Sequence, residues 1–261
     1  MAERNNVRYV EPIQDRSVDT PEAMPVEPVH RRRDLDGGLQ APGWLATHPA
    51  VGLSLFLLGL VVFGFLAYQL QSNGPMVQLD QEVGSMMQGI ASKAPGMLLE
   101  FMTYGFFMGK ENLQVLGAIL VVYFLYKRYW PELGMVLIGW TGGTVVWTLL
   151  INYFNRPRPD KQLGIEVKTI PSFPSGHTMF AILALGLLAY LLVPKMPSLF
   201  WKWVIVLAAV LTMLFVGFTR LYEGGHFLSD LIAGYAVGLS WGALVYTLLD
   251  GVALRRRTHH G

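Results

Sequence analysis

Hydrophobic and polar residues are arranged along this chain in long blocks. After a polar stretch over residues 1–43, six apolar runs follow one another with polar connections between them. The runs are Val51–Leu70, Leu113–Tyr126, Leu133–Tyr153, Thr178–Val193, Leu199–Phe218 and Phe227–Leu249. A helix needs roughly 17–25 residues to cross the hydrocarbon core, so we expect the second and fourth runs to extend through their less apolar flanks. The pattern predicts an all-α integral membrane protein with six transmembrane helices.

A seventh segment, Pro95–Met108, is amphipathic and is interrupted by polar residues. The charge pattern favours an interfacial helix here rather than a seventh span. With six spans, all basic clusters fall on one side of the membrane: Arg31–Arg33, Lys127 with Arg128, Lys195 with Lys202, and Arg255–Arg257. Basic loops face the cytoplasm, so both termini are expected there. The connections 154–176 and 219–226 are then expected on the outer face.

Composition agrees with a membrane protein and excludes some chemistry. Hydrophobic residues make up 52% of the chain, and its mean hydropathy is +0.40. The chain has no cysteine, which excludes disulfides, thiolate metal sites and a cysteine nucleophile. A net charge of +2 is too small to indicate a nucleic-acid partner. We expect residues 1–43 to be a disordered cytoplasmic segment. Residues 44–261 are expected to form one membrane domain with a short basic tail.

A histidine and a carboxylate lie close together at the start of the last apolar run. His226 and Asp230 are four residues apart, so a helix would place both on one face. A carboxylate bound to one ring nitrogen fixes the tautomer and leaves the other nitrogen free to act as a nucleophile. Taken alone, the two residues could equally be a structural pair.

The two predicted outer connections carry further groups that suit an anion. Arg158 and Arg220 can bind phosphate oxygens through their guanidinium forks. Ser175 and Gly176 can offer a hydroxyl and an amide at a helix N-terminus, where anions bind. His177, which follows them, can transfer a proton. Each motif alone has an ordinary structural explanation, but all fall on one membrane face, where charged groups are costly. Together they indicate a phosphate site.

These segments resemble the three-part signature of the type 2 phosphatidic acid phosphatase superfamily, which includes membrane lipid phosphatases and soluble vanadium haloperoxidases. The resemblance covers about residues 80–249. It implies a six-helix membrane fold and hydrolysis through a phosphohistidine, with no metal or other cofactor. By motif position, the resemblance makes His226 the nucleophile, Asp230 its orienting partner and His177 the general acid. It assigns phosphate binding to Arg158, Arg220, Ser175 and Gly176.

Two positions depart from the family pattern. The first segment of the family begins with a lysine, where this chain has Ile151, and the third usually opens with serine, where it has Thr219. The loss of the lysine removes one cation that would bind phosphate. Asn155 or Arg156, which are nearby in sequence, are candidates to replace it as phosphate ligands.

Small residues continue the row of His226 and Asp230 along the last run. Gly234, Gly238 and Gly242 follow at steps of four residues. Small residues at this spacing allow helices to pack closely in membranes. We therefore expect this ridge to face the bundle and to hold the histidine and carboxylate inward, with the effect weakening toward Gly242.

The resemblance leads us to expect an enzyme of a bacterial inner membrane that hydrolyses a lipid phosphate or diphosphate taken from the outer leaflet. Undecaprenyl diphosphate is the first choice of substrate, and phosphatidate, phosphatidylglycerol phosphate and lipid A phosphate also fit a site on the outer face. Two alternatives stay open: transfer of the phosphoryl group to another lipid, and a non-hydrolytic transporter or binding protein, which Ile151 would favour. The sequence gives no oligomeric state.

Overall fold

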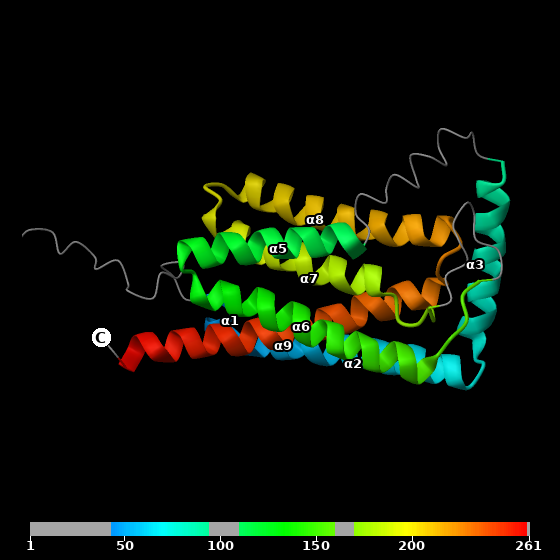
Figure 1. Cartoon of the computed structure of the whole chain (residues 1–261), viewed down its shortest axis with the longest axis horizontal. Helices are drawn as coiled ribbons and strands as arrows, with labels where there is room; N and C mark the ends of the chain where they lie inside the picture. Colours follow the sequence, from blue (N-terminus) through cyan, green and yellow to red (C-terminus); the bar gives the residue numbers. More distant parts are fainter. Residues whose placement is uncertain (1–42, 94–109, 160–169, 260–261) are drawn as a thin grey trace, which may run out of the picture. The chain divides into compact units, whose positions relative to one another are not determined.

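The computed structural model describes residues 43–93, 110–159 and 170–259, and these ranges contain helices and connections but no strands (Figure 1). The helices are α1 (Trp44–Thr47), α2 (Pro49–Gln71), α3 (Pro75–Ala91), α5 (Lys110–Lys127), α6 (Trp130–Phe154), α7 (Gly176–Leu192), α8 (Leu199–Tyr222) and α9 (Leu228–His259), with a short 3-10 helix at Val193–Lys195. The segment predicted to be disordered, 1–43, lies almost wholly outside the described residues.

The predicted spans all form helices, so the all-α membrane fold is confirmed. Within the described ranges, five helices are long and apolar enough to cross a bilayer: α2, α6, α7, α8 and α9. The fourth run extends to Gly176–Lys195, as expected. The second run also forms a helix, α5, but its apolar part, Val115–Lys127, is shorter than the others. Large apolar side chains such as Val61, Leu149 and Leu199 are exposed, as expected for surfaces in contact with lipid tails.

The last helix, α9, is the centre of the bundle. In its most apolar segment 61% of residues are buried, against 17–44% in the other four candidate spans. It contacts α1, α2, α3, α6 and α7. Because the N-terminal end of α9 carries Asp230 and directly follows His226, the best-packed helix of the bundle also positions these two residues.

Glycines on α9 allow the backbones of α7 and α9 to approach each other closely. A methyl group at Gly234 would overlap the carbonyl oxygen of Ser175 and the hydroxyl of Thr178. At Gly238 it would lie 2.7 Å from the carbonyl oxygen of Met179. At Gly242 the nearest atom would be a Leu183 side-chain carbon at 3.3 Å, a looser contact. The predicted inward-facing glycine ridge and its weakening toward Gly242 are confirmed.

Helix α3 (Pro75–Ala91) is an element that the apolar runs did not predict. It contacts α2, α8 and α9, and in Figure 1 it runs across one end of the bundle, drawn in cyan. Its large exposed apolar side chains, Leu79, Met86 and Ile90, share one stripe, whereas Asp80 points inward and is 1% exposed. The interfacial helix predicted at Pro95–Met108 lies outside the described residues.

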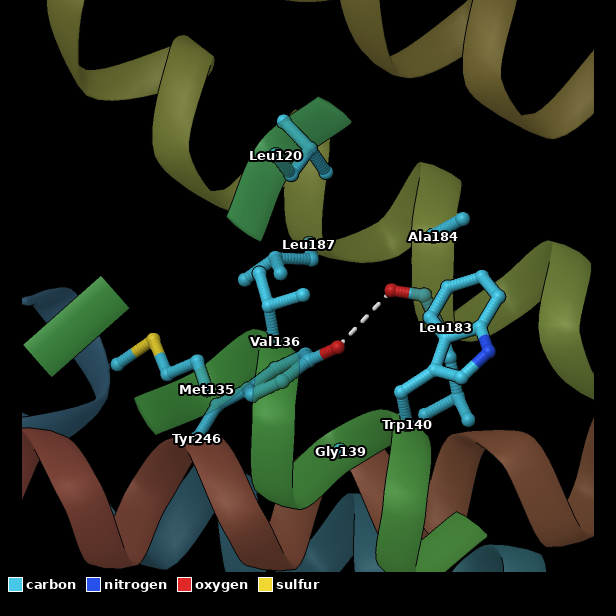
Figure 2. A pocket seen from close by; sticks show the side chains of 9 residues that line it. All are labelled: Leu120, Met135, Val136, Gly139, Trp140, Leu183, Ala184, Leu187 and Tyr246. Carbon is cyan, nitrogen blue, oxygen red and sulfur yellow. Dashed lines mark hydrogen bonds between the residues drawn. The ribbon is translucent and has the colours of Figure 1, made fainter. Parts of the chain in front are cut away.

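Figure 2 shows an apolar pocket between α5, α6, α7 and α9. Its lining residues are Leu120, Met135, Val136, Gly139, Trp140, Leu183, Ala184, Leu187 and Tyr246. Its polar contact is a hydrogen bond from the Tyr246 hydroxyl to the Leu183 carbonyl, 2.9 Å long. Its cavity volume is about 10 Å³, far below the roughly 300–1,000 Å³ of typical ligand pockets. With no charged group in its wall, it is not suited to bind a phosphate.

The close approach of α7 and α9 predicts that Gly234→Ala destabilises the protein. The added methyl group meets backbone, which cannot move aside as a side chain can, so we expect a loss of about 1–3 kcal/mol in the free energy of unfolding. Thermal unfolding in detergent measures it. Gly186→Ala on α7 is the matched control, since no atom lies within 4 Å of its new methyl group. Equal stability of the two variants would contradict the packing.

Candidate active site

The three motif segments meet at one end of the bundle, as the sequence predicted. They lie at the end of α6, the start of α7, and between α8 and α9. The Ser175 amide donates to the Asp230 carbonyl over 2.9 Å, and the Ser172 amide donates to the Arg156 carbonyl over 2.8 Å. These backbone bonds join the first segment to the second and the second to the third. The side of the membrane that this end faces stays a prediction.

His226 is placed just before α9 and not within it, since the helix begins at Leu228. This corrects the expectation that one helix carries both His226 and Asp230. The Nδ1 atom of His226 lies 3.0 Å from the Ser172 carbonyl oxygen and 3.5 Å from Asp230 Oδ2. Both oxygens only accept, so we assign the ring proton to Nδ1. The lone pair is then on Nε2, the state a nucleophile needs.

Burial lowers the pKa of the His226 imidazole below its usual value. The bond to Asp230 opposes this shift, and the positive charges of Arg158 and Arg220 reinforce it. The imidazole is therefore neutral at neutral pH, with its Nε2 lone pair unprotonated.

Arg158 lies directly beside the Nε2 atom. Its Nη1 is 3.3 Å from His226 Nε2 and also donates to the Gly225 carbonyl, while its Nε donates to the Ile170 carbonyl over 2.8 Å. Burial lowers the pKa of this guanidinium from a very high value, and Asp230 opposes the shift, so the group stays charged at neutral pH. A positive charge next to a nucleophilic nitrogen is where a phosphoryl group would be bound.

Arg220 has its charge balanced by a neighbour on the same helical turn. Its Nη2 donates to Glu223 Oε1 over 3.0 Å, and both side chains are buried. Gly224 follows in the left-handed region at φ 68°, which a residue with a side chain rarely adopts. The chain thereby turns sharply from Arg220 toward His226. The Gly225 amide closes this turn by donating to the Arg220 carbonyl over 3.0 Å.

The start of α7 supplies donors on the other side of the histidine. Ser175 is the N-cap of α7, and its buried Oγ has no hydrogen-bond partner among the described residues. A buried hydroxyl without a partner is uncommon and fits a position reserved for a ligand oxygen. Gly176 packs on the ring of Trp147, whose Nε1 donates to the Pro174 carbonyl over 3.1 Å. The His177 ring lies 5.7 Å from the His226 ring, centre to centre.

The two candidate replacements for the missing lysine are placed differently from each other. Asn155 ends α6 in the left-handed conformation and is exposed. Arg156 is buried and donates to two carboxylates, to Asp230 over 2.7 Å and to Asp80 over 2.8 Å. These partners do not favour Arg156 as a phosphate ligand, because its guanidinium is already committed to two anions. Ile151, at the family's lysine position, is buried.

Comparison with known proteins agrees with this arrangement. Residues 132–252 match the PAP2 superfamily model. Over these residues, just under half of the chain, the resemblance to the PAP2 superfamily is confirmed. Phosphatidylglycerophosphatase B of Bacillus subtilis (strain 168) is 35% identical over 130 residues, which are 49% of this chain and 61% of that protein. The chain thus spans less than two thirds of that relative. The crystal structure of a transmembrane PAP2-type phosphatidylglycerolphosphate phosphatase from Bacillus subtilis superposes with a TM-score of 0.60 at 26% identity, covering 78% of this chain and 96% of the other.

Three residues of this site were missed by sequence reasoning or given no role. The Ser172 carbonyl holds His226, Glu223 pairs with Arg220, and Asp80 on α3 binds Arg156. The role of a backbone carbonyl cannot be predicted from the sequence, because every residue has one. Glu223 and Asp80 resemble many polar surface residues until the fold buries them. For Asp80, a helical pattern of apolar residues in 75–91 was the available indication.

We expect His226 to titrate below the ordinary histidine pKa of about 6.5, because burial disfavours its charged form. The unfolded chain then binds this proton more readily than the folded one. The histidine therefore contributes most to stability above that pH, and the contribution falls as the pH drops toward the folded value. Histidine-selective NMR in detergent measures the midpoint, and loss of the signal in His226→Asn identifies it. A midpoint at or above 6.5 would refute the neutral assignment.

Proposed function

We propose that this PAP2 protein is a membrane lipid phosphatase that hydrolyses a lipid phosphate through a phosphohistidine at His226. The observation that carries the proposal is the position of His226 Nε2, whose lone pair lies 3.3 Å from the Arg158 guanidinium while Nδ1–H is held by a carbonyl. A buried neutral nucleophile beside a fixed cation is suited to attack phosphorus. A site that only bound phosphate would not need this fixed tautomer.

In the first half of the reaction, His226 Nε2 attacks phosphorus and an N–P bond forms. The P–O bond to the leaving group breaks, and His177 gives its proton to the departing oxygen. The leaving group is a lipid alcohol for a monoester and a lipid monophosphate for a diphosphate. Asp230 stabilises the positive charge that develops on the imidazole, because it lies 3.5 Å from Nδ1.

In the second half, His177 takes a proton from water and the water oxygen attacks phosphorus. The N–P bond breaks and inorganic phosphate leaves. Throughout, Arg158 and the N-terminus of α7 with Ser175 bind the phosphoryl oxygens. Arg220 contributes a further guanidinium from the end of α8. Its pairing with Glu223 orients it and reduces its net charge at the site.

The site is proposed to face the outer side of a bacterial inner membrane. Basic residues lie at the opposite ends of the same helices: Lys127 and Arg128 before α6, and Lys195 and Lys202 between α7 and the start of α8. The positive-inside rule places those ends in the cytoplasm. A lipid in the outer leaflet would then present its head group at the level of the site.

For the substrate, the activity by which both similar proteins are named favours phosphatidylglycerophosphate over the other candidates. Undecaprenyl diphosphate, the first choice from the sequence, has no comparable support and serves as the second candidate. Both would present a terminal phosphate to the same site, so the chemistry at His226 is common to them.

We expect the purified protein to release inorganic phosphate from phosphatidylglycerophosphate faster than from undecaprenyl diphosphate, phosphatidate or lipid A phosphate. Release should persist in EDTA and fall by at least about a thousandfold in His226→Ala, because the proposed N–P bond forms at His226 Nε2. Gly186→Ala, away from the site, is the matched control. Equal release from His226→Ala and wild type would disprove the phosphohistidine route.

Ser175→Ala tests the proposed ligand role of the unpartnered hydroxyl. Loss of one phosphoryl donor should lower kcat/KM by about 10–100-fold. Thermal stability should change little, because the hydroxyl makes no bond to the described residues. Steady-state phosphate release and thermal unfolding measure the two quantities. A variant with full activity, or one that loses activity only in proportion to its stability, would remove Ser175 from the phosphate site.

A further inference from the structure

Asp80 on α3 is a buried carboxylate that reaches the site from outside the three motif segments. Its Oδ2 accepts from Arg156 Nη2 over 2.8 Å, and its Oδ1 accepts from the Ser229 amide over 2.8 Å. The Ser229 hydroxyl donates to the same carboxylate. One side chain of α3 thereby holds both the first turn of α9 and the arginine that follows α6.

Arg156 connects this carboxylate to the catalytic pair. Its Nη1 donates to Asp230 Oδ1 over 2.7 Å and to the Ser229 hydroxyl over 2.8 Å. Its guanidinium carbon also lies 4.1 Å from the centre of the Phe227 ring. Held on both sides, the guanidinium joins Asp80 to Asp230, whose other oxygen lies beside His226. The chain of contacts runs Asp80, Arg156, Asp230, His226.

We propose that Asp80 is a positioning residue for the reaction: through Arg156 it sets the orientation and effective charge of Asp230, and hence the readiness of His226 to carry positive charge. This inference rests on the proposed phosphohistidine function. It makes α3, which lies outside the family's motif segments, part of the machinery of the site. The proposal assigns Asp80 no contact with the substrate.

The physical reason is the balance of charge beside the imidazole. Two carboxylates, Asp80 and Asp230, share one guanidinium, so the trio keeps a net negative charge next to Nδ1–H. That charge favours the positive imidazole that forms as the N–P bond is made. Without Asp80, Arg156 would act on Asp230 alone and cancel its charge. The developing positive charge on His226 would then be stabilised less.

Other charged groups face His226 and stay in place when Asp80 is replaced. Arg158 lies beside Nε2, Arg220 acts from the end of α8 with Glu223 bound to it, and the His177 ring is 5.7 Å away on α7. A change in the titration midpoint of His226 when Asp80 is replaced therefore measures the effect that Asp80 exerts through Arg156.

The test compares Asp80→Asn with wild type, using Glu82→Gln as the matched control. Glu82 is an exposed acid on the same helix, so its variant also removes one charge from α3. In Asp80→Asn we expect the His226 NMR titration midpoint to move to lower pH by about 0.5–1 unit, because a negative charge is lost. We also expect kcat to fall roughly tenfold or more with KM little changed. Glu82→Gln should match wild type in all three quantities.

If Asp80→Asn does not fold, the comparison is made in an Arg156→Gln background. The double variant Asp80→Asn with Arg156→Gln loses one negative and one positive charge together, so no buried arginine is left without its partner. We expect its His226 midpoint to match that of Arg156→Gln alone, because the path from Asp80 through Arg156 is already removed in that background. A further shift to lower pH in that pair, or equal midpoints in wild type and a folded Asp80→Asn, would overturn the inference.

The NMR midpoint needs no turnover, so the inference is tested separately from the proposed function. If wild type releases no phosphate, or if His226→Ala releases it as fast as wild type, the proposed function is rejected. If the His226 titration midpoint is the same in Asp80→Asn and wild type, only the positioning role of Asp80 is rejected. A kcat loss in Asp80→Asn with an unchanged midpoint and lowered thermal stability would assign Asp80 to the fold alone.

Discussion

The site depends on the direct contact between the backbones of α7 and α9. The Ser175 amide donates to the Asp230 carbonyl, and the Thr178 hydroxyl donates to the Leu231 carbonyl over 3.0 Å. Gly234 lets the two helices come this close, because any side chain there would overlap the Ser175 carbonyl. The contact joins the N-terminus of α7, with the Ser175 hydroxyl, to the residues that hold His226. Without this contact, Ser175 at the start of α7 and His226 before α9 would have no fixed distance between them.

Around that contact, the buried charges are arranged so that the arginines differ in role. Arg156 and Arg220 are bound by carboxylates, whereas the bonds of Arg158 go to backbone carbonyls and toward His226. A guanidinium that donates to carbonyls keeps its full charge, while one between carboxylates is neutralised. The same residue type thus binds a buried carboxylate at Arg156 and keeps a full positive charge beside His226 at Arg158. Their separation by a single proline in the sequence gives no hint of this difference.

The long apolar runs predicted the helices well because a bilayer leaves few other options for an apolar stretch of this length. The order and spacing of the Ser175–His177 and Arg220–Asp230 segments also predicted that they would meet. Helix α3 was missed because its apolar stripe is narrow and its polar residues are numerous, as is usual for a helix that lies against a bundle. Asp80, on that helix, was missed with it.

The sequence alone determined the membrane class, the positions of the long apolar helices and the candidate residues for a phosphate site, since these follow from local composition and motif spacing. Only the tertiary structure decided how those residues are used. It placed His226 before α9, set its Nδ1 within hydrogen-bond distance of the Ser172 carbonyl and set Arg156 between Asp80 and Asp230. The physical reason is that hydrogen bonds and charge pairs at this site join residues up to 149 positions apart. Such pairings depend on how the helices pack, which no local pattern in the sequence records.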